Sequence, residues 1–520
     1  MQIFSFSPFG YEGSLVTVEV DLRRGIPAID LIGLADGAVK ESRERMKSAI
    51  RNSGFEFPME RVLISLSPAD LKKEGAGFDL ALALAVLEAD SRKNDGEIDM
   101  NPEPILVMGE LELSGALRPV KAVHAAAATA AAAGIRKCIV SSANAAEARE
   151  VTGMKVFGAT NLGDAFEALS NPDFFTGGAD ESDSFVPENS VLIDGVLFPA
   201  ENPDLEFGDI KNQQRLVRAL QIAAAGGHNL LAFGSPGCGK TLALQRFPNL
   251  LPLLTVEESQ SVTRIHSLAG LLSPNQPLMR VAPFRMPHQT ASIEGICGGG
   301  TSCRPGEISL SHNGVLFLDE AAEFRSSVLQ MLRVPLESGC ITLSRAGRST
   351  TYPARFQLLM ATNPCPCGNY GSPTKICLCS AKSVEQYWRK FSAPLLDRID
   401  IRVNVSSENS ECENENSSST AELRVQIASA VKIQRIRGKK NAAFTPQDVL
   451  EFCEIDKESR GILDEAVSKN DFSQRAISGI LKLSRTIADM DGSEKICRVH
   501  LEEAISFRSN VGVLELFSGE

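Results

Sequence analysis

The stretch NLLAFGSPGCGKTLALQ (229–245) joins an apolar run to a helical pattern through a glycine-rich turn. Eight of its residues fit G-x-x-x-x-G-K-[ST], a pattern that is specific only between a strand and a helix, as here. The glycines let backbone N–H groups face phosphate oxygens, and the start of the helix favours negative charge. We expect Lys240 to reach the β- and γ-phosphates and Thr241 to coordinate Mg²⁺. The turn therefore predicts an ATP site formed by Gly234, Ser235, Pro236, Gly237, Cys238, Gly239, Lys240 and Thr241.

Two further apolar runs end in polar residues and fit the same site. VLFLDE (315–320) ends in Asp319 and Glu320, and LLMATNP (358–364) ends in Asn363. Buried parallel strands that stop in such residues place them at the carboxyl edge of a sheet, beside the phosphates. We expect Asp319 to join the Mg²⁺ shell, Glu320 to polarise the attacking water and Asn363 to orient that water.

Arginines C-terminal to these strands are candidates for contact with the γ-phosphate. PLLDRID (394–400) places Arg398 between two acids. The predicted helix SQRAISGILKLSRTIADM (473–490) carries Arg475 near its start and Arg485 further along. An arginine finger supplied by a neighbouring subunit stabilises transition-state charge. Arg398 is the candidate finger, with an intramolecular Arg–Asp pair as the alternative. Arg475 is the candidate second arginine, and Arg485 is its competitor.

Composition and charge divide the chain into parts. At 520 residues, the chain is too long to fold around a single hydrophobic core, so several domains are expected. Residues 1–170 alternate strand-like and helical runs, which predicts an α/β domain. Residues 171–210 are predicted to be an acidic linker, 211–405 a second α/β domain, 406–420 a low-complexity connection and 421–520 a helical domain. The net charge of −12 hides a core, 211–405, that holds 20 basic and 11 acidic residues.

The remaining bulk features bear on the compartment. The sequence contains no run of eighteen or more apolar residues, so it predicts no membrane span. The first residues, MQIFSFSPFGYEG, do not resemble a secretion signal. Twelve cysteines without an export signal indicate free thiols or metal ligands. We expect a cytoplasmic protein.

Taken together, these motifs resemble the YifB/ComM family of magnesium-chelatase-like AAA+ ATPases along nearly the whole chain. Specific matches are GLADGAVKESRERMKSAIRNSGFEFP (33–58), SPADLKKEGAGFDLALA (67–83), MPHQTAS (286–292), RPGEISLSHNGVLFLDE (304–320) and NPCPCGNYG (363–371). The resemblance implies a Lon-protease-like α/β N-domain, an AAA+ parallel-sheet P-loop core and a C-terminal helical lid. It also implies homo-hexameric rings and, for the best-understood members, DNA helicases that drive branch migration in natural transformation. The same roles carry over to Lys240, Thr241, Asp319, Glu320, Asn363, Arg398 and Arg475.

Two features depart from the families compared. Residues 406–420 are longer and more acidic than the usual connection to the lid. Lon-type proteases need a nucleophilic Ser and an activating Lys, whereas Gly75 and His124 stand at the corresponding positions here. The N-domain is therefore predicted to be catalytically inactive.

Four cysteines, Cys365, Cys367, Cys377 and Cys379, form C-x-C-x₉-C-x-C within fifteen residues. Four thiolates suit tetrahedral Zn²⁺, although C-x-x-C is the commoner spacing. Free thiols in a loop and a redox-sensitive pair are the alternatives.

Basic loops in the core are candidates for nucleic-acid contact. Residues 337–359 predict two strands joined by a tight turn at Arg345-Ala346-Gly347-Arg348, and the insertion 280–312 carries Arg280, Arg285 and Arg304. Such loops could grip phosphates in a ring channel, or only pack neighbouring subunits. A second basic run is either another contact or a solvated helix face, and it comprises Arg424, Lys432, Arg435, Arg437, Lys439 and Lys440.

Three functions follow from these observations. The leading hypothesis is an ATP-hydrolysing ring motor that acts on single-stranded or branched DNA. The second is a metal-insertion ATPase subunit like that of magnesium chelatase, and the third is a relative of ATP-dependent proteases, which the missing Ser and Lys count against.

Overall fold

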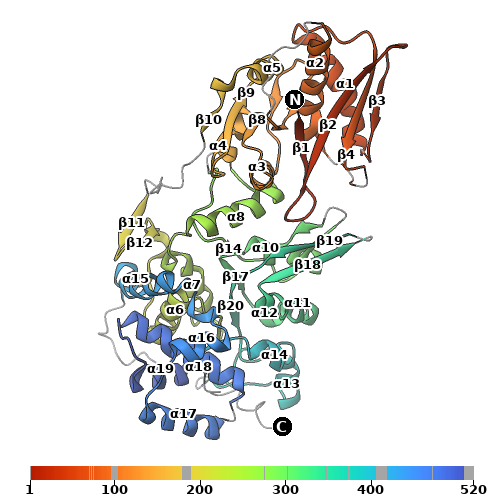
Figure 1. Cartoon of the computed structure of the whole chain (residues 1–520). Coiled ribbons are helices and arrows are strands. Elements are labelled where there is room, and N and C mark those ends of the chain that lie inside the picture. The colour runs from red at the N-terminus through yellow and green to blue at the C-terminus, as the bar shows by residue number, and fades with distance from the viewer. Residues whose placement is uncertain are drawn as a thin grey trace.

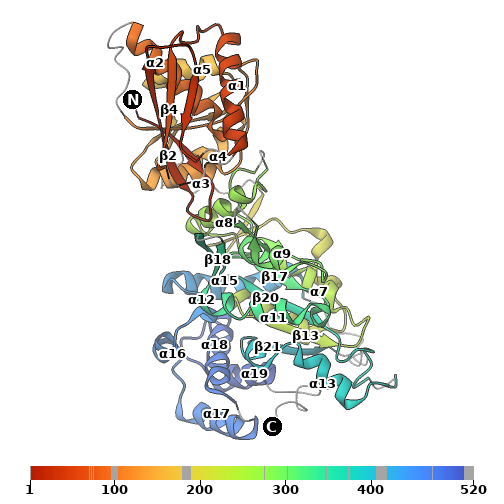
Figure 2. The same ribbon diagram turned by 90° about the vertical axis from the view of Figure 1, so that its right-hand side faces the viewer.

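A computed structural model gives the architecture of the chain and describes residues 2–34, 36–69, 71, 73, 75–94, 103–177, 189–273, 276–300, 303–345, 348–372, 375–405, 418–470 and 472–508. Three parts follow one another along the long axis of the molecule (Figures 1 and 2). The N-terminal domain lies at one end, the nucleotide-binding core in the middle and the helical lid at the other end. The predicted α/β class is confirmed for the first two parts.

The N-terminal domain is a sheet covered by helices on both faces. The sheet is mixed and runs in the order β10-β9-β8-β5-β1-β2-β4-β3. Its strands are β1 Ile3–Ser7, β2 Ser14–Arg23, β3 Ile29–Ile32, β4 Arg61–Ser67, β5 Ile105–Met108, β8 Lys137–Ser141, β9 Lys155–Ala159 and β10 Thr176–Gly177, and a separate pair is β6 Glu110–Leu111 with β7 Leu117–Arg118. One face packs against α1 Gly37–Asn52, α2 Asp79–Asn94 and α5 Leu162–Ser170, and the other against α3 Val123–Ala132 and α4 Ala145–Arg149.

The segment predicted to be an acidic linker has defined structure on both sides of 178–188, which lie outside the described residues. β10 pairs with β9 and so extends the N-terminal sheet. Residues 190–199 form a hairpin of β11 Ser190–Ile193 and β12 Val196–Pro199. Phe198 and Phe207 are fully buried in the hydrophobic cluster of the core. Burial of these aromatic rings explains why an acidic composition did not leave the segment unstructured.

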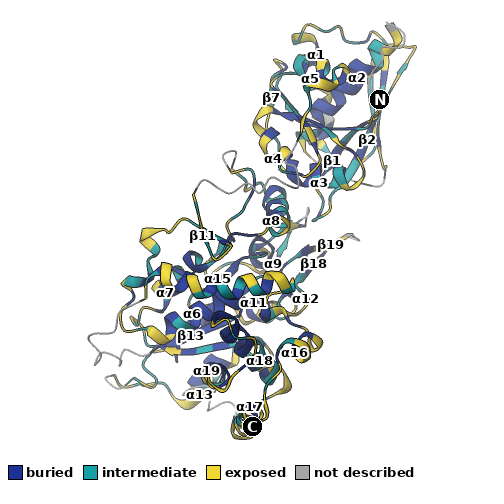
Figure 3. Cartoon of the chain, turned by 60° about the vertical axis from the view of Figure 1, so that its left-hand side comes forward, coloured by how far each residue is buried: buried dark blue, intermediate teal, exposed yellow. Residues whose placement is uncertain are grey.

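The core contains a five-stranded parallel sheet in the order β14-β17-β20-β13-β21. β13, β17 and β20 are buried at every position, as expected for central strands covered on both faces (Figure 3). The strands are β13 Leu230–Gly234, β14 Phe284–Arg285, β17 Val315–Leu318, β20 Gln357–Thr362 and β21 Ile401–Val405. The helices are α6 Gln214–Gly226, α7 Lys240–Gln245, α8 Val256–Ala269, α9 Ile293–Cys297, α10 Glu307–Leu310, α11 Ser326–Met331, α12 Pro335–Ser338, α13 Ala381–Arg389 and α14 Ala393–Leu396.

Two short antiparallel pairs lie outside this sheet. β15 Gly298–Gly299 pairs with β16 Arg304–Pro305. The predicted basic hairpin is confirmed as β18 Cys340–Arg345 and β19 Arg348–Pro353, with Arg345 opposite Arg348 in the register. Residues 346 and 347 of its turn lie outside the described residues.

The lid consists of α15 Thr420–Arg437, α16 Pro446–Phe452, α17 Lys457–Asn470, α18 Gln474–Met490 and α19 Arg498–Arg508. Thr445 caps α16, and Pro446 lies in its first turn. Ser419 and Glu422 form a capping box that starts α15, one residue from the predicted boundary. Residues 406–417 of the predicted low-complexity connection lie outside the described residues. In the described part of the chain, no helix combines the length and apolarity needed to cross a membrane.

The basic run of the lid is engaged within the chain itself. The buried Arg424 guanidinium donates to Asn249 O at 2.7 Å and to Pro199 O at 2.9 Å. Arg437 makes a two-pronged contact with the buried Asp489. The other four basic side chains bind Asp194, the carbonyl of Leu253, Asp448 and Glu258. Four of the six side chains attach the lid to its surroundings, and Arg437 and Lys439 form ion pairs within the lid. These contacts argue against a second nucleic-acid contact there.

Candidate active site

The glycine-rich turn leaves β13 and enters α7 as the sequence predicts. Gly237 has φ 84° and Gly239 has φ 77°, conformations that glycine adopts without strain. Lys240 Nζ donates to Gly234 O at 2.7 Å and to Ser235 O at 2.8 Å, so the ammonium lies inside the curve of the loop. Burial lowers the pKa of Lys240, and Cys238 and Asp319 oppose that shift. The loop thus presents a desolvated cation where phosphate oxygens are expected.

Asp319 and Glu320 follow β17 directly, and the structure joins Asp319 to the phosphate loop. Thr241 Oγ1 donates to Asp319 Oδ1 at 3.1 Å, and the Glu320 N–H donates to the same oxygen at 3.0 Å. Glu320 has φ 49°, a left-handed conformation that costs a non-glycine residue about 1 kcal/mol. Its side chain is exposed. The strained backbone separates two consecutive carboxylates, leaving Glu320 available to a water molecule.

Thr241 and Asp319 fit the Mg²⁺ ion that an ATP site of this kind uses. A hydroxyl and a carboxylate oxygen 3.1 Å apart are hard oxygen ligands, the type that Mg²⁺ prefers. When bound, the ion neutralises charge on the phosphate oxygens. The chain's own part is to hold Thr241 and Asp319 together at the carboxyl ends of β13 and β17.

Asn363 follows β20, the strand that lies between β13 and β17 in the sheet. The order of strands therefore brings Asn363 to the same edge as the phosphate loop and Asp319. An ideal Cβ built on Gly368 would lie 2.6 Å from Pro236 Cγ and 4.0 Å from Asn363 Cγ. The chain that follows Asn363 thus touches the phosphate loop directly.

The two candidate arginines share one acidic partner, Glu337 at α12. Arg398 Nη2 donates to Glu337 Oε2, and Arg475 Nη2 donates to Glu337 Oε1 at 2.9 Å. The hydrogen bond from Arg398 lowers the pKa of Glu337 below its ordinary value. The alternative predicted for Arg398 was a pair with a neighbouring Asp, and its described acidic partner is Glu337 instead. The structure therefore brings Arg398 and Arg475 together, although 77 positions separate them in the chain.

The backbone around Arg398 is held by residues that the sequence gave no reason to single out. Arg508, buried at the end of α19, donates to the carbonyls of Ile399 and, at 2.8 Å, Asp397. Asn229 Nδ2 donates to the carbonyl of Arg398 at 2.9 Å. Three consecutive carbonyls are thereby fixed from two sides. No local motif marks Arg508 or Asn229, because each contact spans more than a hundred positions.

Arg485, the competitor of Arg475, lies inside the lid. Its side chain is buried, contacts Asp489 at 3.0 Å and donates to Glu494 O at 2.8 Å. Arg475, in contrast, is half exposed. The structure thus favours Arg475 for a role at a nucleotide.

The four cysteines predicted as a metal site lie together after Asn363. The Sγ atoms of Cys365, Cys367 and Cys377 are 3.4 to 3.7 Å apart, and all four Sγ atoms lie within 4.8 Å of one another. A hydrogen bond from the backbone N–H of Asn369 lowers the pKa of Cys367 to about 6. The backbone of Cys379 stabilises the Cys377 thiolate, but desolvation and the Cys367 and Cys365 side chains outweigh it and raise the pKa of Cys377 to about 12. The crowded thiols therefore resist ionising together.

The N-terminal domain has neither the Ser nor the Lys that Lon-type proteolysis needs at positions 75 and 124. Gly75 has φ 92° and no atoms within 4 Å of an ideal Cβ. His124 is buried and shares a 2.7 Å hydrogen bond with Gln260 of α8, and burial lowers its pKa to about 4. His124 thus contributes to the contact between the N-terminal domain and the core.

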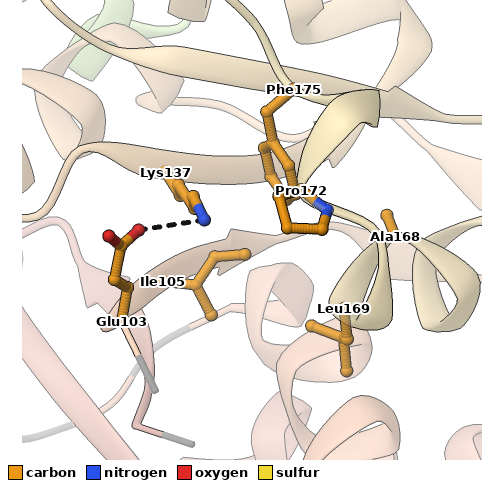
Figure 4. Close-up of a pocket in the computed structure, with 7 residues that line it drawn as sticks. All are labelled: Glu103, Ile105, Lys137, Ala168, Leu169, Pro172 and Phe175. Atoms are coloured by element: carbon orange, nitrogen blue, oxygen red, sulfur yellow. Dashed lines mark ion pairs between the residues drawn. The ribbon is translucent and has the colours of Figure 1, made fainter. Parts of the chain in front are cut away.

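A shallow pocket in the N-terminal domain does not supply an alternative centre (Figure 4). Lys137 lies at its edge, 2.9 Å from Glu103, and close to the ring of Phe175. The other four lining residues are apolar and none of the seven carries a hydroxyl or thiol. Its lining therefore offers no hydroxyl or thiol nucleophile, and the Lys137 amine is paired with Glu103.

Comparisons with known proteins agree with this arrangement. A family model described as magnesium chelatase, subunit ChlI, matches residues 206–413, one described as subunit ChlI of Mg-chelatase matches 18–144, and one described as the ChlI C-terminal part matches 416–508. The chain is 37% identical to competence protein ComM of Haemophilus influenzae over 99% of both chains. It is 38% identical to the uncharacterized protein YifB of Escherichia coli, over 96% of this chain and 95% of that one. A magnesium-chelatase 38 kDa subunit of Rhodobacter capsulatus is 28% identical over 31% of this chain and 51% of the subunit.

Near-full-length similarity of this extent shows the family, and the family supports AAA+ ATPase activity with the use of ATP and Mg²⁺. The chain belongs to the YifB/ComM family of magnesium-chelatase-like AAA+ ATPases.

Proposed function

We propose that this chain is a ring-forming ATPase motor, a homo-hexamer, that acts on single-stranded or branched DNA as a branch-migration helicase. The observation that carries the proposal is the β18–β19 hairpin, which extends from the core (Figure 1). Its backbone register pairs Arg345 with Arg348 at the end of the two strands. A ring would repeat this pair of charges in every subunit. Repetition multiplies a weak phosphate contact without new chemistry.

The position of the hairpin supports a part in substrate handling. Its strand β19 packs against the β1–β2 loop of the N-terminal domain, where the Tyr11 N–H donates to Thr350 Oγ1 at 3.2 Å. The Tyr11 ring meets the Tyr352 ring edge-on at 6.2 Å, and the Arg264 guanidinium lies 4.7 Å from the Tyr11 ring centroid. The N-terminal domain is therefore a platform beside the hairpin, and its position suits a guide for a bound strand.

The other basic groups of the insertion contribute less to this surface. Arg285 forms a two-pronged ion pair with Glu307 at 2.6 and 2.8 Å and is half buried. Arg304 on β16 is exposed. Of the described groups in this insertion, Arg304 is the stronger second candidate for a phosphate contact.

The relatives support the DNA function over metal insertion. The name of the Haemophilus influenzae relative refers to competence, and that relative matches along 99% of this chain. The magnesium-chelatase 38 kDa subunit of Rhodobacter capsulatus matches 31% of it. Gly75 and His124 stand where Lon-type proteases have their catalytic Ser and Lys, and this counts against proteolysis.

We expect the ATPase rate to rise on addition of single-stranded or forked DNA, and DNA affinity to fall steeply with salt because phosphate contacts release counterions. Arg345→Ala with Arg348→Ala should abolish this stimulation and fork unwinding while keeping the basal ATPase rate and the ring. Steady-state ATPase assays, salt titrations of DNA binding and a fork-unwinding assay measure these effects.

A matched control removes the same charge elsewhere. Arg460 and Arg498 are exposed on the lid, and Arg460→Ala with Arg498→Ala should leave the DNA response unchanged. Unwinding at the parent rate by the hairpin variant would place the strand elsewhere, with Arg304 next. No response of the parent protein to any DNA would refute the proposed motor function.

A further inference from the structure

Four thiols converge on one point in the loop between β20 and α13. Three of their Sγ separations are 3.4, 3.7 and 3.5 Å, and Cys379 Sγ lies within 4.8 Å of the others. The pairs come from opposite ends of the loop, so the chain must fold back to bring them together. Gly368, with φ 77°, makes the turn after the first pair, and its N–H donates to Cys365 O at 2.9 Å.

These separations fit ligands of one metal ion. A tetrahedron of sulfurs about 2.3 Å from a central ion has edges of about 3.8 Å. A disulfide would need sulfurs about 2.05 Å apart, and all four cysteines are free. Four sulfur ligands in a tetrahedron select Zn²⁺ over the hard cations that carboxylates bind.

We propose that Cys365, Cys367, Cys377 and Cys379 bind one Zn²⁺ ion and that the resulting knuckle holds the phosphate loop against the end of β20. Four protein ligands leave no open position, so the ion is structural. The assignment concerns the ATP site alone and stands apart from the proposed action on DNA.

The surroundings of the knuckle connect it to the sheet. The buried Trp388 Nε1 donates to Pro364 O at 2.9 Å, and Tyr387 OH and Thr362 Oγ1 lie 3.0 Å apart. Both aromatic residues belong to α13, which begins at Ala381, just after the last cysteine. The helix thus holds the end of β20 from one side, and the metal would fix the loop that joins them.

The contact with the phosphate loop is direct. An ideal Cβ on Gly368 would lie 2.6 Å from Pro236 Cγ and 2.7 Å from its Cδ. The backbone at Gly368 therefore rests on the proline that starts the curve of the loop. Cys367 directly precedes Gly368, and the carbonyl of Cys365 accepts the Gly368 N–H, so metal ligation at these two thiols would fix the surface on which Pro236 lies.

Metal analysis of the full-length protein, purified under reducing conditions without chelators, tests the ion. We expect about one zinc per chain, and Cys365→Ser with Cys367→Ser should lose it. Cys340 and Cys497 lie outside the cluster, and Cys340→Ser with Cys497→Ser should retain the zinc. Absence of zinc from the parent protein, or iron in its place, would overturn the assignment.

Thiol protection gives a second measurement that needs no variant to fold. In the parent protein, Cys367 should resist alkylation until zinc is removed by a chelator, whereas the exposed Cys497 should react throughout. Mass spectrometry of the labelled peptides measures both rates. Equal reaction of Cys367 and Cys497 in the untreated protein would show free thiols.

The contact with Pro236 has its own test. Gly368→Ala should keep the zinc but raise the KM for ATP by about tenfold, because ångström-scale displacement of a binding group has effects of that order or larger. Gly371 shares the left-handed backbone, with φ 73°, yet a Cβ there meets no atom within 4 Å. Gly371→Ala should therefore leave the KM near the parent value. Equal KM values in the two variants would show that the knuckle does not support the phosphate loop.

Discussion

Replacement of Arg398 with alanine is expected to lower the kcat for ATP hydrolysis by about a thousandfold while leaving ATP affinity nearly intact. An arginine supplied to the transition state contributes an effect of that order or more. Arg398 follows β20 in the chain, and its side chain forms an ion pair with Glu337. Steady-state kinetics and titration with a fluorescent ATP analogue measure the two quantities.

Mixing experiments identify the subunit on which Arg398 acts. Rings that combine Arg398→Ala subunits with Lys240→Ala subunits should recover part of the activity, because an intact Arg398 then lies beside an intact phosphate loop. Arg389 is exposed on α13, and Arg389→Ala is the matched control that should keep the parent rate. Mixed rings that assemble but stay inactive would show that Arg398 does not serve a neighbour.

The variant Glu320→Gln should bind ATP but hydrolyse it at least about a hundredfold more slowly. Amide oxygen is too weak a base to help a water molecule attack, and positioned general-base help is worth 10² to 10⁴. Asp319, which holds Thr241, stays in place, so the KM should change little. Single-turnover hydrolysis and ATP titration separate these effects.

Glu323→Gln provides the comparison, since Glu323 is also exposed and lies three residues further along. It should hydrolyse ATP at the parent rate. Lys240→Ala should lose nucleotide binding as well as turnover, because the ammonium lies inside the loop. Turnover near the parent rate in Glu320→Gln would mean that another group activates the water.

The parts of the site that follow strands could be predicted from sequence, and the parts that join distant segments could not. The phosphate loop, Asp319 and Asn363 each follow an apolar strand, so local pattern and the geometry of a parallel sheet were enough to bring them to one edge. The ion pairs of Glu337 with Arg398 and Arg475 span 61 and 138 positions. No periodicity in the sequence carries information about such pairs.

Charge and composition were the least reliable guides. Six basic residues of the lid resembled either a second contact or a solvated face, but Arg424 is buried and all six bind groups within the chain. The acidic segment 171–210 resembled a linker, yet Phe198 and Phe207 belong to the hydrophobic core. In both cases the average composition was misleading, because a few apolar or ion-paired side chains determined the local structure.

The hydrogen bonds from Arg508 to the carbonyls of Asp397 and Ile399 join α19, the last described helix, to the segment that carries Arg398. α19 also packs on α18, so a displacement of the lid would also displace the segment that carries Arg398. In the proposed ring, a rotation of the lid after hydrolysis would move Arg398 relative to the nucleotide of the neighbouring subunit. The order of hydrolysis around the proposed ring would then need no further contact between subunits.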